Sequence, residues 1–395
     1  MKRDQIPSLT GLRFIAAFSV AFSHAVLYIF SPPAPGGSVL ILSAYDLAIS
    51  AAGLGMPLFF VLSGFVIHYN YSAKIESGSF NELLNFFVAR FSRLYPLYLC
   101  VLGFSALTTK AVPLSALAYY IPMLQSWFYS IYGDNSLIYA LGPRASILWS
   151  VSTEWFFYVV YPPICFSLAA LRTQRSRVIA IACLVISALA LVSLAIWNVD
   201  AINGFGRDTF GPIAESGPYG QSSFFRWLLY FSPYSRISEF LLGCLVASLY
   251  LNRSESGETS GLWLTSLAVL LLASSYFAFF GLDRFPWFHN FGILHMSFGL
   301  APGIALLIYC CAHYENPVTR ALEAPWLVIC GEASYSLYLW HVIVIECFLR
   351  DTTSLRILGV CLLSCVSVSL LSWKFIEIPS RNWLRSALTK RPAGS

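Results

Sequence analysis

Charged residues are scarce in this sequence. Only 11% of its 395 residues are Asp, Glu, Lys or Arg, against about 25% in soluble domains. Hydrophobic residues make up 57% of the chain, and the mean hydropathy is +0.69. A chain with so few polar side chains cannot cover its apolar surface in water, so a soluble fold is excluded. We therefore expect an all-α integral membrane protein.

Patterns typical of several other classes are also missing. The ten cysteines lie mostly inside apolar stretches and form no Cys-x-x-Cys arrangement with histidines, so they are interpreted as small packing residues. The net charge is +5, but the basic residues lie at the ends of apolar segments rather than in one patch. We expect no metal site, no tightly bound cofactor, no nucleic-acid partner and no internal repeat.

Apolar runs of about 20 residues, the length that crosses a bilayer, predict ten transmembrane helices. They are 9–30, 46–69, 88–108, 149–171, 178–198, 229–251, 261–281, 291–313, 326–348 and 355–374. The first run resembles a signal peptide in its position. Because Arg13 and His24 lie within it and no clean cleavage site follows, we expect it to remain as the first span.

The distribution of basic residues predicts the orientation. With both termini in the cytoplasm, the basic residues gather preferentially at the cytoplasmic ends of the spans. The aromatic stretch 113–129 is short and contains Pro122, so we expect it not to span; re-entrant and interfacial placements both stay open. Residues 199–227, rich in Gly and Pro, predict an irregular external loop and a candidate lid. The domain boundary is expected between a transmembrane domain, 1–380, and a basic cytoplasmic tail, 381–395.

Ionisable side chains inside the predicted spans mark a candidate site, because a charge at the centre of a bilayer helix costs roughly 2.5–3.5 kcal/mol. Arg13 and His24 are eleven positions apart, which is roughly 16 Å of depth at about 1.5 Å per residue. Arg90 and Arg93 enter from the inner side, level with Arg13. The sequence thus predicts a basic inner layer.

A second layer is predicted nearer the outer face. Glu154 and His341 are expected at the depth of His24, and Glu239 about half-way down its span. A carboxylate that accepts from one imidazole nitrogen fixes the tautomer and raises the basicity of the other nitrogen. The predicted pair of His24 and Glu154 is therefore a candidate general base for a hydroxyl.

The inner arginines suit a polyanionic donor, because guanidinium binds phosphate bidentately and keeps its charge. An inner phosphate clamp and an outer base fit a long-armed acyl carrier such as acyl-CoA. Structural explanations stay open beside this one. Arg90 and Arg93 are also explained as ordinary anchors at the cytoplasmic face, and His341 as a packing histidine. His24 and Glu154 are also explained as a purely structural pair.

Several blocks, in order along nearly the whole chain, resemble the integral-membrane acyltransferase family 3, bacterial O-acyltransferases of surface glycans, lipids and some small molecules. They are "LTGLRFIAAFSVAFSH" with Arg13 and His24, "FFVLSGFVI", the R-x-x-R of Arg90 and Arg93, "LWSVSTEWFFYVVYP" with Glu154, "RISEFLLGCLVA" with Glu239, "GEASYSLYLWHVIV" with Tyr338 and His341, and "EIPSRNWL" with Glu377 and Arg381.

The resemblance implies transfer of an acyl group, usually acetyl, from cytoplasmic acyl-CoA to an acceptor hydroxyl at the outer face of the bacterial inner membrane. It implies ten spans in a multi-pass protein. His24 and Glu154 are then the expected catalytic residues. Arg13, Arg90 and Arg93 are the expected CoA ligands, and His341, Tyr338 and Glu239 the expected contacts of a glycan, lipid or small-molecule acceptor.

One position departs from the family pattern. Trp155 stands where many members have a second acidic residue, and we expect Glu154 alone to suffice. Direct transfer and an acyl-enzyme both stay open. The alternative function is a multi-span transporter or flippase of a lipid or glycan, because buried charges also mark transport pathways. No inverted repeat supports that alternative. A third alternative, a non-catalytic membrane scaffold, does not explain why Arg13 and His24 lie within one span.

Overall fold

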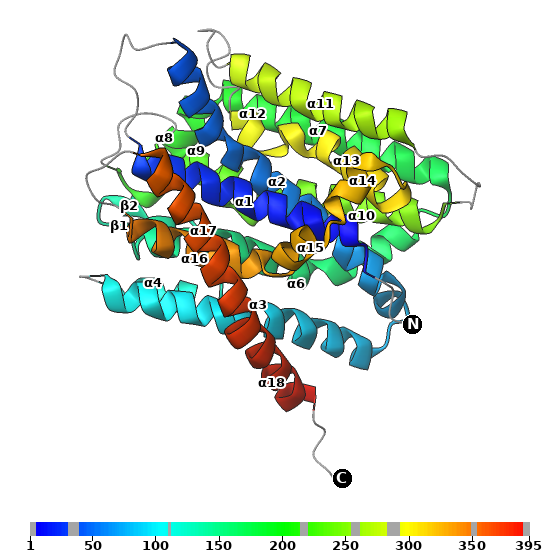
Figure 1. The fold of residues 1–395 in the computed structure, drawn as a ribbon, viewed down its shortest axis with the longest axis horizontal. Coiled ribbons are helices and arrows are strands. Elements are labelled where there is room, and N and C mark those ends of the chain that lie inside the picture. Colours follow the sequence, from blue (N-terminus) through cyan, green and yellow to red (C-terminus); the bar gives the residue numbers. More distant parts are fainter. Residues whose placement is uncertain are drawn as a thin grey trace. The chain divides into compact units, whose positions relative to one another are not determined.

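The computed structural model describes residues 5–30, 39–109, 112–213, 220–253, 261–282, 293–348 and 354–389. These residues are almost entirely helical (Figure 1). Within the described ranges, the strands are two short ones, β1 (Ile131–Tyr132) and β2 (Asn135–Ser136), which pair antiparallel as a hairpin. The expectation of an all-α membrane protein is confirmed.

Helices lie at each of the ten predicted spans. They are α1 (Pro7–Ile29), α2 (Val39–Glu76), α3 (Phe80–Thr108), α6 (Trp149–Ala169), α7 (Gln174–Trp197), α10 (Pro233–Leu251), α11 (Leu262–Leu282), α12 (Ile293–Met296) with η4 (Phe298–Leu300) and α13 (Ala301–His313), α15 (Pro325–Glu332) with α16 (Ser334–Glu346), and α17 (Leu355–Ser372). Within the described residues, five helices are long and apolar enough to cross a membrane, and the pair α15–α16, bent by 70°, is a candidate sixth.

Shorter helices connect these elements. They are α4 (Leu114–Tyr120), η1 (Leu137–Tyr139), α5 (Pro143–Ser146), α8 (Val199–Phe210), α9 (Phe224–Arg226), the π-helical η2 (Trp227–Phe231), α14 (Pro317–Leu322), the π-helical η5 (Trp373–Glu377) and α18 (Ile378–Thr389). The predicted domain boundary, between residues 380 and 381, falls inside α18, which packs against α3.

The stretch 113–129 does not form a spanning helix, as the sequence predicts. Its helix, α4, has seven residues and is roughly 10 Å long. The chain then turns at Met123, whose φ is 60°. Tyr120 anchors this segment by donating its hydroxyl to the carbonyls of Leu137 and Ile138, at 3.0 and 2.7 Å, and burial raises the pKa of that hydroxyl.

The segment 199–227 corrects a prediction. Residues 199–210 are not an irregular loop but form α8, and the Asn203 side chain accepts a hydrogen bond from the Phe225 N–H at 2.9 Å. Gly206 serves close packing instead of a turn, since a Cβ there would lie 2.4 Å from the Cβ of Phe224. Residues 214–219 lie outside the described ranges, and a lid function for the segment stays a prediction.

The chain divides into two units. The first comprises residues 3–62 and 252–373, and the second comprises residues 63–251 and 374–395. The helix α2 belongs to both, with the division between Leu62 and Ser63. In the second unit α10 packs against α6 and α7. Gly64 permits one close approach there, because a Cβ would lie 2.0 Å from the Phe240 carbonyl oxygen.

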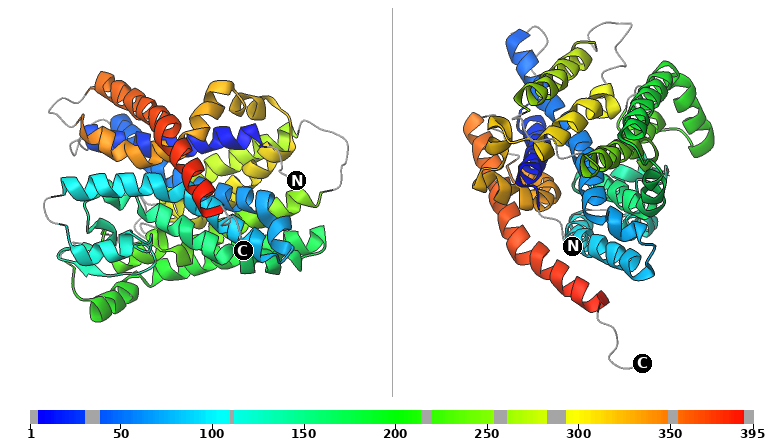
Figure 2. Two further views of the ribbon diagram at one scale, coloured as in Figure 1. Left: turned by 90° about the horizontal axis from the view of Figure 1, so that it is seen from below. Right: turned by 90° about the vertical axis from the view of Figure 1, so that its right-hand side faces the viewer.

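In the first unit α1 packs against α14, α15, α16 and α17. The right-hand view of Figure 2 looks nearly along the blue α1, with the orange helices α15–α17 beside it. Two glycines permit the close approach. A Cβ on Gly11 would lie 2.1 Å from the Leu322 carbonyl oxygen, and one on Gly331 would lie 2.0 Å from that of Thr10. These contacts fix α1 against the helices that carry the first part of the site.

Candidate functional site

Arg13 and His24 lie on one face of α1. Their separation of eleven residues is close to three full turns of about 3.6 residues each, so both side chains project on the same side of the helix. Both are partly buried. Ala17, Ala21 and Ala25 are fully buried on the same helix, and their small side chains let the neighbouring helices approach closely.

His24 contacts His341 of α16. The Nδ1 atom of His24 lies 2.7 Å from Nε2 of His341, although the two residues are 317 positions apart in the sequence. The ring planes differ by 9° and the ring centroids are 5.0 Å apart. The centroids are much farther apart than the two nitrogens, so the rings meet edge to edge through a hydrogen bond.

The second nitrogen of His341 is also occupied. Its Nδ1 lies 2.6 Å from the carbonyl oxygen of Tyr338, one turn earlier on α16. His341 is fully buried and Tyr338 is 6% exposed. The Tyr338 ring packs edge-on against Phe59, with centroids 5.9 Å apart. The structure thus brings together three of the predicted site residues, His24, Tyr338 and His341.

Two contacts from α17 hold α16 at this point. Trp340 donates its indole N–H to the hydroxyl of Ser372 at 2.9 Å. The thiol of Cys365 lies 3.9 Å from the backbone carbonyl of His341, and Cys361, one turn earlier, is buried with it. These cysteines act as the small packing residues that the sequence predicts.

Glu154 has its described partners in the second unit. One carboxylate oxygen, Oε1, accepts a hydrogen bond from Ser63 at 3.2 Å and a short one from the Tyr158 hydroxyl. Tyr158 follows Glu154 by one turn of α6, which is why its side chain reaches the carboxylate. The predicted pairing of Glu154 with His24, which belongs to the other unit, stays a prediction.

Arg90 lies between two tyrosines. Its Nη2 donates to the Tyr71 hydroxyl at 2.8 Å, and its Cζ is 4.9 Å from the centroid of that ring and 6.0 Å from that of Tyr158. Both geometries favour cation–π attraction. The Nε atom of Arg90 is buried and has no hydrogen-bond partner among the described residues. Arg93 lies one turn further along α3 and is partly buried.

Tyr158 links two residues that the sequence analysis places in different layers. Arg90 was expected in the inner layer and Glu154 in the outer one, but Tyr158 contacts both. Tyr158 lies one turn after Glu154 on α6, and the two-layer arrangement itself stays a prediction. Sequence reasoning missed Tyr158, and its i+4 spacing from Glu154 is the signal that indicates it.

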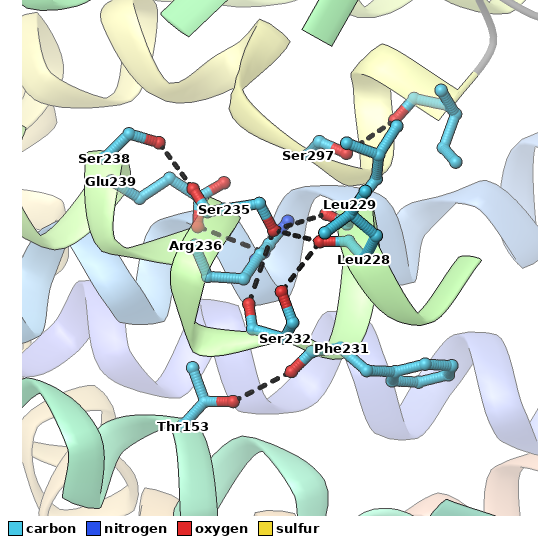
Figure 3. Close-up of polar contacts among 11 residues, drawn as sticks. Thr153, Leu228, Leu229, Phe231, Ser232, Ser235, Arg236, Ser238, Glu239 and Ser297 are labelled. Atoms are coloured by element: carbon cyan, nitrogen blue, oxygen red, sulfur yellow. Dashed lines mark hydrogen bonds and ion pairs between the residues drawn. The ribbon is translucent and has the colours of Figure 1, made fainter. Parts of the chain in front are cut away.

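Glu239 forms a buried ion pair with Arg236 on α10. The distance from Nη2 of Arg236 to Oε2 of Glu239 is 3.1 Å, and each side chain is 1% exposed (Figure 3). The ring of Tyr230 lies 5.6 Å from the guanidinium carbon. In the structure, therefore, the predicted acceptor contact Glu239 is engaged with a neighbouring arginine.

The π-helical segment η2 positions this pair. A π-helix shifts the backbone hydrogen bonds from i+4 to i+5, and nearby hydroxyls bond to its carbonyl oxygens. Ser232 and Ser235 both donate to the Leu228 carbonyl, at 2.8 and 2.6 Å (Figure 3). Thr153, next to Glu154 on α6, donates to the Phe231 carbonyl at 3.0 Å. These bonds fix the start of α10 against α6.

Comparison with known families identifies relatives across most of the chain. The family model described as "Acyltransferase domain" matches residues 6–373. O-acetyltransferase OatA of Staphylococcus aureus strain NCTC 8325 is 25% identical over 393 residues, which cover 95% of this chain and 57% of that protein. A putative O-acetyltransferase of S. aureus strain COL is 23% identical over 413 residues, covering 99% of this chain and 60% of that protein.

The chain thus spans about three fifths of the length of the curated relatives it matches. No solved structure matches it significantly. The resemblance to this family is confirmed by the match over residues 6–373, which contains every motif block except the closing "EIPSRNWL".

Proposed function

Since the chain belongs to this acyltransferase family, we propose that it transfers an acyl group, with acetyl the expected one, from cytoplasmic acyl-CoA to a hydroxyl of a glycan or glycolipid at the outer side of the membrane. The names of the relatives, O-acetyltransferases, favour acetyl and an oxygen acceptor. The observation that carries the proposal is the family match, whose range contains every predicted catalytic, donor-binding and acceptor-binding residue.

The proposed location is the bacterial inner membrane, crossed ten times with both termini in the cytoplasm. Helices at each of the ten apolar runs support the number of spans, and the distribution of basic residues supports the orientation. In that orientation α1 begins at the cytoplasmic side. Arg13 then lies near the donor side, and His24 lies about three turns deeper in the membrane.

The proposed donor contacts are Arg13, Arg90 and Arg93, which bind the phosphates of CoA. Arg90 is the best supported, because Tyr71 and Tyr158 hold its guanidinium group and its buried Nε–H has no partner among the described residues. A side chain that is already ordered loses less conformational entropy when a ligand binds. A phosphate oxygen would satisfy this donor.

The proposed general base is His24. In a direct transfer, the acceptor oxygen attacks the thioester carbonyl while the hydroxyl proton passes to the imidazole of His24. The carbon–sulfur bond then breaks, and the CoA sulfur leaves with the proton that His24 received. Three further roles are proposed and tested separately by the assay described next. They are Glu154 as a second catalytic residue, and Tyr338 and Glu239 as acceptor contacts.

The test is acetyl-CoA turnover by purified protein in lipid nanodiscs. We expect the wild type to release CoA, His24→Ala to lose roughly 10²- to 10⁴-fold in kcat, and Arg93→Ala to raise the KM for acetyl-CoA about tenfold. Arg172→Ala, at an exposed arginine after α6, is the matched control and is expected to behave as wild type.

Each other result has a defined meaning. If no variant, including the wild type, binds or releases CoA, the acyl-CoA proposal is contradicted. Movement of a lipid or glycan across the bilayer by the same preparation would then identify a transporter or flippase. Binding of acetyl-CoA without release supports the donor site, and addition of glycan and glycolipid acceptors then tests the transfer step.

A further inference from the structure

We propose that His341 is a positioning residue that fixes the tautomer of His24, so that Nε2 of His24 is the basic atom of the reaction. This inference rests on the proposed function, because it assigns the atom that receives the proton of the acceptor hydroxyl. It departs from the sequence analysis, which placed His341 at the acceptor and gave the orienting role to Glu154.

The argument begins at the Tyr338 carbonyl. A carbonyl oxygen only accepts hydrogen bonds, so Nδ1 of His341, 2.6 Å away, carries a proton. A neutral imidazole has one protonated nitrogen. Nε2 of His341 is therefore an acceptor. His341 is fully buried, and its hydrogen-bond partners are the backbone of Tyr338, the backbone of Leu337 and the ring of His24.

The second step passes this constraint to His24. Nε2 of His341 lies 2.7 Å from Nδ1 of His24, and two nitrogens at that distance need a proton between them. Because Nε2 of His341 carries none, Nδ1 of His24 supplies it. The remaining nitrogen of neutral His24, Nε2, then has a free lone pair. The small angle of 9° between the ring planes keeps this hydrogen bond in the plane of both rings.

The arrangement also suits the charge that forms during transfer. When Nε2 of His24 accepts the hydroxyl proton, the ring becomes an imidazolium, and its Nδ1–H donates a charge-assisted hydrogen bond to His341. His341 stabilises that charge without itself changing protonation state. This is the role that an acidic residue plays in a serine protease triad, carried out here by a neutral ring whose own tautomer is set by the backbone.

The geometry that holds His341 comes from three helices. Its backbone carbonyl lies 3.9 Å from the Cys365 thiol, and its neighbour Trp340 donates to Ser372 of α17. His24 is held because α1 packs directly against α16. The carboxylate of Glu154 accepts hydrogen bonds from Ser63 and Tyr158. The pairing of Glu154 with His24 stays a prediction, which the ¹⁵N spectra of Glu154→Gln test.

The experiment records ¹⁵N spectra of histidine-labelled protein in nanodiscs, together with turnover. The chain has six histidines, so the signals of His24 and His341 can be assigned from their single substitutions. We expect His24 protonated at Nδ1 and unprotonated at Nε2. In His341→Leu we expect a mixture of tautomers at His24 and a fall in kcat of about tenfold or more, with the KM for acetyl-CoA unchanged.

His341→Gln is the conservative variant. Its side-chain oxygen can accept from His24 and its amide N–H₂ can donate to a carbonyl, so we expect it to restore the tautomer and most of kcat. A wild-type His24 protonated at Nε2 would overturn the proposal, even if His341→Leu does not fold. Equal tautomers and equal kcat in wild type and His341→Leu would also overturn it. A wild type that neither binds nor releases CoA contradicts the proposed function instead, because the spectra need no turnover.

Discussion

Arg236 and Glu239 form an ion pair inside the second unit, with 3.1 Å between Nη2 and Oε2 and each side chain 1% exposed. The two residues are three positions apart on α10, so the pair is local to one helix face. In a buried site each charge depends on the other, because desolvation of an unpaired ion costs several kcal/mol. The pair therefore has a structural role that can be separated by experiment from the predicted role of Glu239 in acceptor binding.

Glu239→Gln is expected to destabilise the protein by about 3–5 kcal/mol, because it removes the carboxylate that pairs with the buried Arg236 charge. The double variant Arg236→Met/Glu239→Leu removes both charges and is expected to be close to wild type in stability. Thermal unfolding in nanodiscs measures both effects. A stable double variant that retains CoA release but has lost transfer to the acceptor would support the predicted contact of Glu239 with the acceptor. A stable double variant with full transfer would contradict that contact.

Tyr158→Phe separates the two contacts of this tyrosine. The phenyl ring can still lie beside Arg90, but the hydrogen bond to Glu154 is lost. If Glu154 acts in catalysis, we expect kcat to fall about tenfold, the equivalent of about 1.4 kcal/mol, with the KM for acetyl-CoA unchanged.

Tyr71→Phe is the matched control for Tyr158→Phe. It removes the hydroxyl that accepts from Arg90 at 2.8 Å, so it is expected to raise the KM for acetyl-CoA and leave kcat unchanged. Identical kinetic effects of the two substitutions would show that neither hydroxyl has the role assigned to it.

Gly11→Ala and Gly331→Ala are expected to impair folding and turnover together. An added Cβ would lie 2.1 or 2.0 Å from a backbone carbonyl oxygen, so α1 would have to move away from α14 or α15. Gly359→Ala is the control, because nothing lies within 4 Å of a Cβ there. That variant is expected to be stabilised by about 0.5–1 kcal/mol, as alanine is the better helix former. The measurement is the thermal unfolding midpoint of each variant. Midpoints of Gly11→Ala and Gly331→Ala equal to that of the wild type would contradict the prediction.

Trp155→Glu is expected to destabilise the protein without raising activity. The Trp155 ring packs with Phe91 and Phe87, at centroid distances of 5.9 and 6.4 Å. A carboxylate there would face aromatic side chains and lose its hydration. Higher turnover in Trp155→Glu would show instead that this chain lacks an acidic group that its reaction needs.

The sequence reveals helices more readily than connections. The ten apolar runs each contain helix, because their length and composition reflect the surrounding lipid directly. The segment 199–210 was misjudged, since its glycines indicate a loop locally, whereas Gly206 serves a contact with Phe224 that exists only after folding. The π-helical segment before α10 likewise depends on hydroxyls from Ser232 and Ser235 that bond back to it.

By itself, the sequence determined the membrane environment, the helical class and the family, and it predicted the side chains that carry the chemistry. Composition and motif spacing are local properties, and each can be read without knowing which helices touch. Only the tertiary structure decided the partners: His341 for His24, 317 positions away, and Tyr158 for both Glu154 and Arg90. Depth along a span is set by counting residues, but the neighbour at that depth depends on the packing of other helices. A hydrogen bond between two imidazoles therefore had to be seen in three dimensions.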